Sequence, residues 1–290
     1  MSLPKTQSHS TVTGHDAETL RLVAEDAARL AGDYLRTVFR SKMEIDYKRD
    51  RHDLVTAHDR AAEELIVPFL LERDPSWRIV GEEGGTRGGD GPVTWYVDPI
   101  DGTSNFAQGL AFFCVSIGAE VDEELRAGVI YDPMADRMFS ADDWHAYLDG
   151  SVLRTAPAQP ADAATMITGY PTARDLAVEG STALEDAGTL IEAFSSLRRT
   201  GSGALTLAHV AAGWVDCAFG GSVNPWDVAA GALIVRRAGG SYRPVWLDAP
   251  QAQRPDHLAP AFMAAGPGAH YPALESFVER VSRRRAGIGD

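Results

Sequence analysis

The chain has few cysteines and few lysines, and its acidic residues outnumber its basic ones. Its only two cysteines, Cys114 and Cys217, lie far apart in apolar runs, which favours buried free thiols over a disulfide or a zinc site. Three lysines accompany 24 arginines, and the 41 acidic residues bring the formal net charge to -14. A surface that binds nucleic acid needs clustered Lys and Arg. We therefore expect no nucleic-acid partner.

Long hydrophobic runs are also missing. The longest apolar windows are far shorter than a membrane span, and the N-terminus lacks the charged and apolar segments of a secretory signal. We therefore expect no membrane partner and, by default, a cytoplasmic location. At 290 residues and 44% hydrophobic, the chain can bury a large core, either as one domain or as two closely packed halves.

The most informative feature that the sequence does contain is an apolar run followed by two acids. Residues 93–97 are β-branched or aromatic and predict a buried strand that delivers Asp98 to its carboxyl end. Pro99 turns the chain before Asp101, so both carboxylates can converge on one cation. Asp101 is also placed to cap a helix whose first N–H groups would face a phosphate. A solvated turn is the alternative, because the same residue types favour turns.

Three further acids lie at boundaries of predicted elements. Glu82 follows a strand-like run, Asp59 precedes an amphipathic stretch at 60–71, and Asp227 lies in the first turn of an apolar helix. Each of them alone is explained by a surface acid or a helix cap. Together they predict a carboxylate site, whose hard oxygen ligands favour Mg²⁺, with Mn²⁺ or Ca²⁺ as competitors.

Periodicity along the chain predicts a mixed α and β fold. We expect residues 1–14 to be a disordered tail. The expected helices cover residues 16–39, 60–71, 179–197, 204–213 and 271–285, and the expected strands end at 82 and 98 or cover 112–119, 125–131, 137–141 and 166–169. An Ala- and Pro-rich stretch near 153–161 predicts two parts, residues 15–155 with most of the acids and residues 156–290 with Asp227.

These motifs resemble those of the inositol monophosphatase family of magnesium-dependent phosphatases. The family's Gly-Glu-Glu matches residues 81–83, its Asp-Pro-Ile-Asp-Gly-Thr matches 98–103, and its late Trp-Asp matches 226–227. Its Asp-Leu-Val-Thr-Ala-x-Asp segment matches residues 53–59. The resemblance covers the chain from about residue 16 to the last predicted helix. It implies an α+β fold, a layered α-β-α-β-α sandwich of the sugar-phosphatase type.

The resemblance also implies roles for individual residues in a phosphomonoesterase that uses two or three Mg²⁺ ions, with Mn²⁺ as a possible substitute. The implied metal ligands are Glu82, Asp98, the carbonyl of Ile100, Asp101 and Asp227. The implied catalytic residues, which orient or deprotonate the attacking water, are Glu82, Thr103 and Asp59. The implied ligands of the phosphate and the rest of the substrate are Gly102, Thr103, Lys48, Gly203 and Gly220. Bound divalent ions also reconcile an acidic chain with an anionic substrate.

The substrate stays open because of one position. Inositol phosphatases carry a sugar-binding acid seven residues before the Trp-Asp aspartate, and this chain has Gly220 there, so selectivity for one polyol is weakened. A small phosphorylated polyol or sugar like inositol monophosphate is the first expectation, with fructose 1,6-bisphosphate, histidinol phosphate and nucleotide 3'-phosphates as alternatives. The alternative from another class is a regulatory or scaffold protein, against which the repulsion of clustered acids argues. The family further implies a homodimer.

Overall fold

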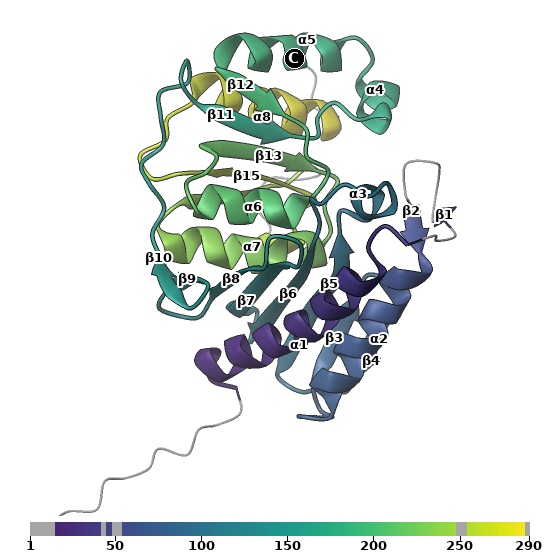
Figure 1. The fold of residues 1–290 in the computed structure, drawn as a ribbon. Helices are drawn as coiled ribbons and strands as arrows, with labels where there is room; N and C mark the ends of the chain where they lie inside the picture. Colours follow the sequence, from purple (N-terminus) through teal and green to yellow (C-terminus); the bar gives the residue numbers. More distant parts are fainter. Residues whose placement is uncertain (1–14, 42–44, 48–53, 248–253, 288–290) are drawn as a thin grey trace, which may run out of the picture.

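The computed structural model describes residues 15–41, 45–47, 54–247 and 254–287. The tail predicted over residues 1–14 and the predicted phosphate ligand Lys48 lie outside the described residues. Within the described ranges, eight α-helices pack on and between two mixed β-sheets (Figure 1). None of the helices in these ranges is both long enough and apolar enough to cross a membrane.

The larger sheet has eight strands in the order β10-β9-β8-β7-β6-β5-β3-β4. Its neighbours pair antiparallel except β3 and β5, which are parallel, so their carboxyl ends lie at the same edge of the sheet. The strands are β3 (Arg78–Gly81), β4 (Gly85–Gly88), β5 (Val93–Asp101), β6 (Cys114–Val121), β7 (Glu124–Asp132), β8 (Arg137–Ala141), β9 (Ala146–Leu148) and β10 (Ser151–Leu153). A separate short pair consists of β1 (Ile45–Tyr47) and β2 (Leu54–Thr56).

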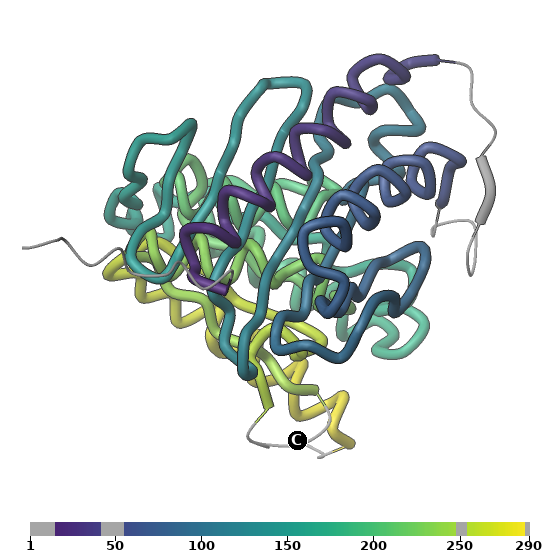
Figure 2. Tube along the Cα trace, turned by 90° about the horizontal axis from the view of Figure 1, so that it is seen from below, coloured from purple at the N-terminus to yellow at the C-terminus, as the bar shows by residue number. Residues whose placement is uncertain are grey.

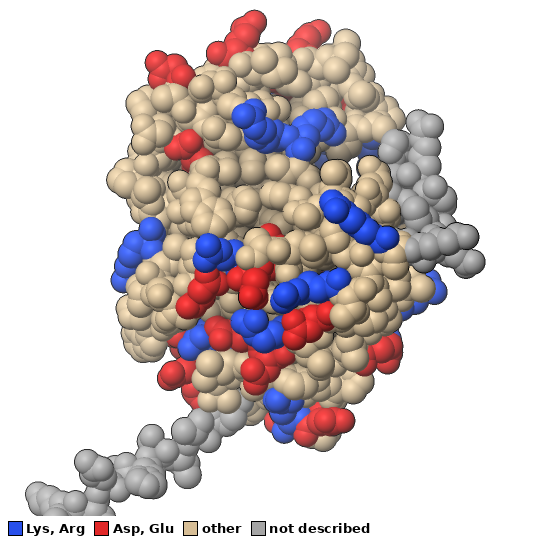
Figure 3. Space-filling view, in the orientation of Figure 1, with Lys and Arg blue, Asp and Glu red and all other residues tan. Residues whose placement is uncertain are grey.

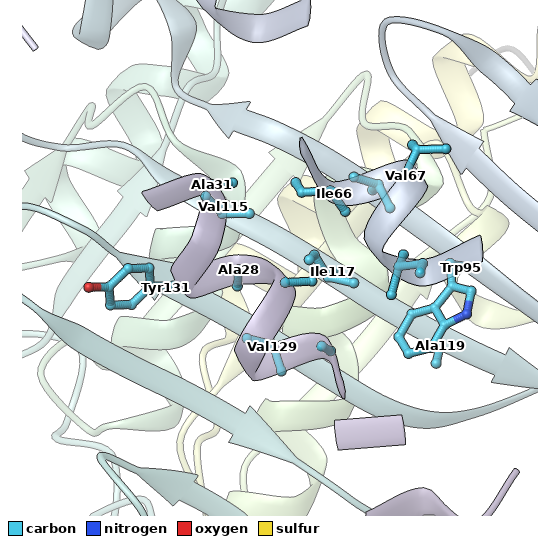
Figure 4. Packing of buried hydrophobic residues seen from close by; sticks show 14 of the residues in the cluster. Ala28, Ala31, Ile66, Val67, Trp95, Val115, Ile117, Ala119, Val129 and Tyr131 are labelled. Carbon is cyan, nitrogen blue, oxygen red and sulfur yellow. The ribbon is translucent and has the colours of Figure 1, made fainter. Parts of the chain in front are cut away.

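Two helices, α1 (Ala17–Val38) and α2 (Ala57–Leu71), lie side by side across the outer face of this sheet (Figures 1 and 2). The side chain of Asp16 caps α1 by accepting a hydrogen bond from the backbone of Thr19 at 3.0 Å. The buried face of α1 is rich in alanine, so the helix can approach the sheet closely. In Figure 4, Ala28 and Ala31 lie against aliphatic side chains of β6 and β7.

The smaller sheet has the order β12-β11-β13-β15-β14, and its first three strands are parallel. Helices α6 and α7 pack between the two sheets, and α5 and α8 cover the outer face of the smaller one (Figure 1). This arrangement confirms the layered α-β-α-β-α sandwich. The remaining elements are α3 (Thr103–Ala107), β11 (Thr165–Thr168), α4 (Ala173–Glu179), α5 (Thr182–Ala193), β12 (Ser196–Arg198), α6 (Gly203–Ala211), β13 (Cys217–Gly221), α7 (Pro225–Ala238), β14 (Ser241–Val245), the 3₁₀ turn η1 (Asp256–Leu258), β15 (Ala261–Ala265) and α8 (Pro272–Arg285).

Two local predictions are wrong. The helix predicted over 179–197 exists as α5 but is shorter at both ends, because Gly180, at a φ of 64°, ends α4 before it, and residues 196–198 form β12 after it. The strand predicted to deliver Asp98 to its end continues to Asp101, since β5 goes on pairing with β6. Asp101 therefore does not cap a helix. The N-cap of α3 is Gly102, at a φ of 98° and without a side-chain hydrogen bond.

Along the chain, β10 is the last strand of the larger sheet and β11 is the first strand of the smaller sheet, and the predicted division at residue 155 lies between them. Helix α7 comes from the later part of the chain but packs on strands of both sheets. The two parts therefore share one helical layer, and their independence stays a prediction. Both cysteines are free and buried, as the sequence predicts.

Candidate functional site

An irregularity near the end of β5 aims two acids toward one place. Pairing with β6 is regular up to Asp98, opposite Ser116, and resumes at Asp101, opposite Cys114. Such bulges redirect side chains that a regular strand would alternate between its faces. Asp98 and Asp101 are 2% and 8% exposed. The backbone N–H of Ile100 donates to Asp98 Oδ1 at 3.0 Å, which holds the intervening turn.

Glu82 and Asp227 reach the same place from a turn and from a helix. The N–H of Glu82 donates to the carbonyl of Val97 at 3.1 Å, which extends the β3–β5 pairing by one residue. Asp227 is the third residue of α7, where its Oδ2 accepts the N–H of Asn224 at 2.7 Å. The charges of Glu82 and Asp227 both act on Asp98. The structure thus brings together the four predicted carboxylate ligands of the metal.

Burial and mutual repulsion favour the protonated forms of this cluster. The pKa of Asp98 lies well above its ordinary value, first because of burial and then because of the charges of the other three acids. The pKa of Asp227 is also raised well above its ordinary value, by burial and then by the charge of Asp101. Burial raises the pKa of Asp101 as well, and hydrogen bonds from Ser202 and from backbone N–H groups partly offset that effect.

The donor chemistry of the cluster fits a hard divalent cation. Carboxylate oxygens and the nearby carbonyl of Ile100 are ligands that Mg²⁺ prefers. Cys114, 3.7 Å from Asp101, stays a thiol, because burial and the neighbouring acids raise its pKa well above the ordinary value. Within the described ranges, no three His, Cys, Asp or Glu side chains already have the spacing of a metal site. The four acids lie close enough for their charges to interact, and a divalent cation bound among them would neutralise that negative charge.

Helix α2 places Asp59 against Thr103. One carboxylate oxygen of Asp59 accepts hydrogen bonds from the backbone N–H and the hydroxyl of Thr56, both at 2.7 Å. The other accepts the hydroxyl of Thr103 at 2.9 Å. Burial raises the pKa of Asp59, and these hydrogen bonds lower it in part. Two residues predicted to act on the attacking water are thus in direct contact.

The start of α6 holds the side chain of Asp101 by hydrogen bonds, and this contact was not predicted from the sequence. Asp101 Oδ2 accepts the hydroxyl of Ser202 and the N–H of Ala204, the latter at 2.7 Å. Its Oδ1 accepts the N–H of Gly203 at 3.2 Å. The only signal in the sequence is the Gly-Ser-Gly turn that opens the helix, because contacts across so many residues leave no local pattern. Gly203, predicted to bind substrate, thus touches a predicted metal ligand.

A cavity of about 190 Å³ extends from Asp101 and Asp227 along the smaller sheet. Its walls come from the ends of the parallel strands β11 and β13 and from the first turns of α4 and α6. Gly203 and Gly220, two of the predicted substrate ligands, both line it. Its aromatic wall consists of Tyr170, Phe219 and Phe262, none of which was predicted from the sequence to line a site.

The aromatic ring of Phe262 explains why position 220 has no side chain. Gly220 in β13 pairs with Phe262 in β15. A Cβ atom on Gly220 would lie 2.3 Å from Cε1 of the ring, which no real contact allows. Phe262 is itself 1% exposed and tightly packed. The space that an acidic side chain would need is therefore filled by an apolar ring.

A five-layered sandwich with buried acids beside a cavity is the arrangement that the motifs predicted for a phosphatase of the inositol monophosphatase type. A sequence profile of the Inositol monophosphatase family matches residues 16–279, and the chain belongs to that family. The chain is 41% identical over 229 residues to inositol monophosphatase 2 of Solanum lycopersicum, covering 75% of this chain and 84% of that protein. It is 38% identical over 222 residues to the Nus factor SuhB of Escherichia coli, covering 75% and 82%.

Solved structures agree with this placement. The extragenic suppressor protein suhB from Bartonella henselae superposes with a TM-score of 0.78 at 29% identity, over 91% of this chain and 98% of that one. Members of the family use divalent metal ions, usually Mg²⁺. The family and the fold predicted from the sequence motifs are therefore confirmed.

Proposed function

We propose that this chain is a Mg²⁺-dependent phosphomonoesterase that hydrolyses a small phosphorylated polyol or sugar. The observation that carries the proposal is the placement of four acids together. Glu82 is hydrogen-bonded through its backbone to Val97, the residue before Asp98, and Asp101 and Asp227 line the same cavity. The two or three ions, when bound, would neutralise phosphoryl charge and lower the pKa of a bound water. The residues that would hold them are Glu82, Asp98, the carbonyl of Ile100, Asp101 and Asp227.

The chain's own part in the chemistry is to place the water and the phosphate. Asp59 accepts a hydrogen bond from the hydroxyl of Thr103, so the hydroxyl oxygen can in turn accept a hydrogen bond from the attacking water. Glu82 would share in orienting or deprotonating that water. The N–H groups of Gly102 and Thr103 would donate to phosphate oxygens, as oxyanion donors do.

The leaving group would occupy the cavity beside Gly203 and Gly220. The ring of Phe262 fills the place of a sugar-binding acid at position 220, so we infer weaker selectivity for one particular phosphorylated polyol. Fructose 1,6-bisphosphate, histidinol phosphate and nucleotide 3'-phosphates are the alternatives that a substrate panel would rank.

For partners we propose a small phosphorylated substrate and a second copy of the chain, in the cytoplasm, without nucleic acid or membrane. The net charge of -14 disfavours binding to nucleic acid. In the lower half of the face drawn in Figure 3, the basic side chains of the described residues are interspersed with acidic ones, whereas a small group of basic side chains lies together in the upper half.

A regulatory or scaffold role is the second candidate. The 38% identity to a protein named Nus factor SuhB favours it. Clustered buried acids favour the enzyme, because they destabilise a metal-free chain that has no use for them.

Phosphate release from inositol, sugar, histidinol and nucleotide phosphates, with Mg²⁺ present and with Mg²⁺ chelated, tests the proposal. Release that chelation abolishes is the expected result. No release from folded protein whose melting temperature Mg²⁺ does not raise would favour the scaffold role.

A further inference from the structure

Glu63 is a buried carboxylate to which neither the sequence motifs nor the proposed chemistry gives a role. It lies on α2 one helical turn after Asp59 and is 1% exposed. A buried carboxylate is costly unless its oxygens accept hydrogen bonds, so its partners indicate what it does.

Both oxygens of Glu63 are occupied by one turn of the backbone. Oε2 accepts the N–H of Glu83 at 2.9 Å, and Oε1 accepts the N–H of Gly84 at 2.7 Å. These two residues and Glu82 form the short turn between β3 and β4, which pair as an antiparallel hairpin beside α2 (Figure 1). Hydrogen bonds to an ionised carboxylate are among the strong ones in proteins. Glu63 therefore holds the two backbone N–H groups that directly follow Glu82 in the chain.

The turn is shaped to admit this carboxylate. A Cβ atom on Gly81 would lie 2.5 Å from Glu63 Oε2, so only glycine leaves room for the side chain at that point. Arg87, from β4, adds a cation 3.5 Å from Glu63 Oε1. The carboxylate is thus enclosed by the hairpin that carries Glu82.

We propose that Glu63 is the positioning residue for Glu82. By fixing the N–H groups that follow Glu82, it keeps Glu82 at the end of the β3–β5 pairing, where its backbone is hydrogen-bonded to Val97, the residue before Asp98. The inference rests on the proposed function only in assuming that the acid cluster binds a divalent cation. Helix α2 would then set two parts of the site from one face, with Asp59 orienting Thr103 and Glu63 orienting Glu82.

The substitution Glu63→Gln tests this proposal with almost no change of volume. One carboxylate oxygen becomes an NH₂ group that faces a backbone N–H, so the turn loses one of its two hydrogen bonds. We expect the dissociation constant of Mg²⁺, measured by calorimetry on the full chain, to rise about tenfold or more, as for other residues that orient metal ligands. The matched control is Glu64→Gln, since Glu64 also pairs with Arg87 but is 57% exposed and should leave affinity unchanged.

A second variant reaches the same contact without altering Glu63. In Gly81→Ala the new methyl group would push against Glu63 Oε2, and we expect Mg²⁺ affinity to weaken here too. Glu63→Gln protein with a lower melting temperature but an unchanged Mg²⁺ dissociation constant would show a purely structural role and overturn the proposal. If that variant does not fold, unchanged affinity in Gly81→Ala overturns it.

The failure of this proposal is distinct from that of the proposed function. Wild-type protein that binds Mg²⁺ but releases phosphate from no substrate would refute the phosphatase and leave the role of Glu63 to the affinity measurements. Wild-type protein that binds no Mg²⁺ would overturn the positioning role as well.

Discussion

The hydroxyl of Thr103 lies 2.9 Å from a carboxylate oxygen of Asp59 and 3.0 Å from the carbonyl oxygen of Ile100. The hydroxyl has a single hydrogen, so it can donate a good hydrogen bond to only one of these two oxygens. A carboxylate oxygen is a stronger acceptor than a carbonyl oxygen, so the hydroxyl donates to Asp59. Directing the proton to Asp59 leaves the Ile100 carbonyl available as a ligand. It also leaves lone pairs of the Thr103 oxygen available to a water.

Thr103→Val removes this hydroxyl and preserves the shape of the side chain. We predict that the rate of phosphate release falls about 10²- to 10⁴-fold, the usual contribution of a group that assists proton transfer. Thr103→Ser keeps the hydroxyl and should retain most of the activity. Steady-state rates and melting temperatures of the two variants decide the matter, and equal rates would exclude a role for the hydroxyl.

Restoring an acid at position 220 requires space as well as charge. Gly220→Glu alone places its side chain against the ring of Phe262, and we predict lower stability with no new selectivity. The double variant Gly220→Glu with Phe262→Ala frees that space. It should discriminate between stereoisomeric polyol phosphates, by about tenfold or more in kcat/KM, because an unpaired buried acceptor penalises the wrong isomer. Phe262→Ala alone is the control, and equal selectivity in all variants would refute this role for the pair.

The metal-free chain should lose stability as the pH rises through the raised pKa values of Asp98 and Asp227. A carboxyl whose pKa is raised by folding contributes stability below its unfolded value of about 3.8, and that contribution disappears above the folded value. Bound Mg²⁺ offsets the repulsion, and protons compete with it at low pH. We therefore predict that Mg²⁺ raises the melting temperature more at about pH 8 than at about pH 5.5. Calorimetry with chelator and with saturating Mg²⁺ measures this, and an equal or larger rise at the lower pH would contradict it.

The acids of the site could be predicted because each lies near the end, the start or an irregularity of a local element. Glu82, Asp98 and Asp227 adjoin local patterns of strand, turn and helix that a short window of sequence contains. Their residue types then limit the chemistry to oxygen ligands. The family motifs supplied the order in which these segments come together.

The residues that support those acids were not predictable in the same way. In the sequence, Glu63 looks like any acid of an amphipathic helix, and only the folded chain shows that the β3–β4 hairpin bonds to it. Ser202 likewise looks like an ordinary helix cap, and its contact with Asp101 comes from a distant strand. Phe262 resembles a core residue until Gly220 is found opposite it. The end of β5 was misjudged because continued pairing with β6 decides it, and pairing is not a local property.

The most direct test of the claim that the four acids bind Mg²⁺ for phosphate release is Asp98→Asn, because the charges of Glu82, Asp101 and Asp227 all act on Asp98. We predict that phosphate release falls at least about 100-fold and that Mg²⁺ no longer raises the melting temperature. The metal-free variant should melt no lower than the wild type, because an uncharged amide at this position meets neither the cost of burying a charge nor repulsion from the other acids. Asp162→Asn makes the same chemical change at an exposed position and serves as the control.

The measurement is therefore Mg²⁺-dependent phosphate release by folded wild-type, Asp98→Asn and Asp162→Asn proteins on the same substrates. The account predicts activity in the first and the third and its loss in the second. Release by Asp98→Asn at the wild-type rate would contradict it.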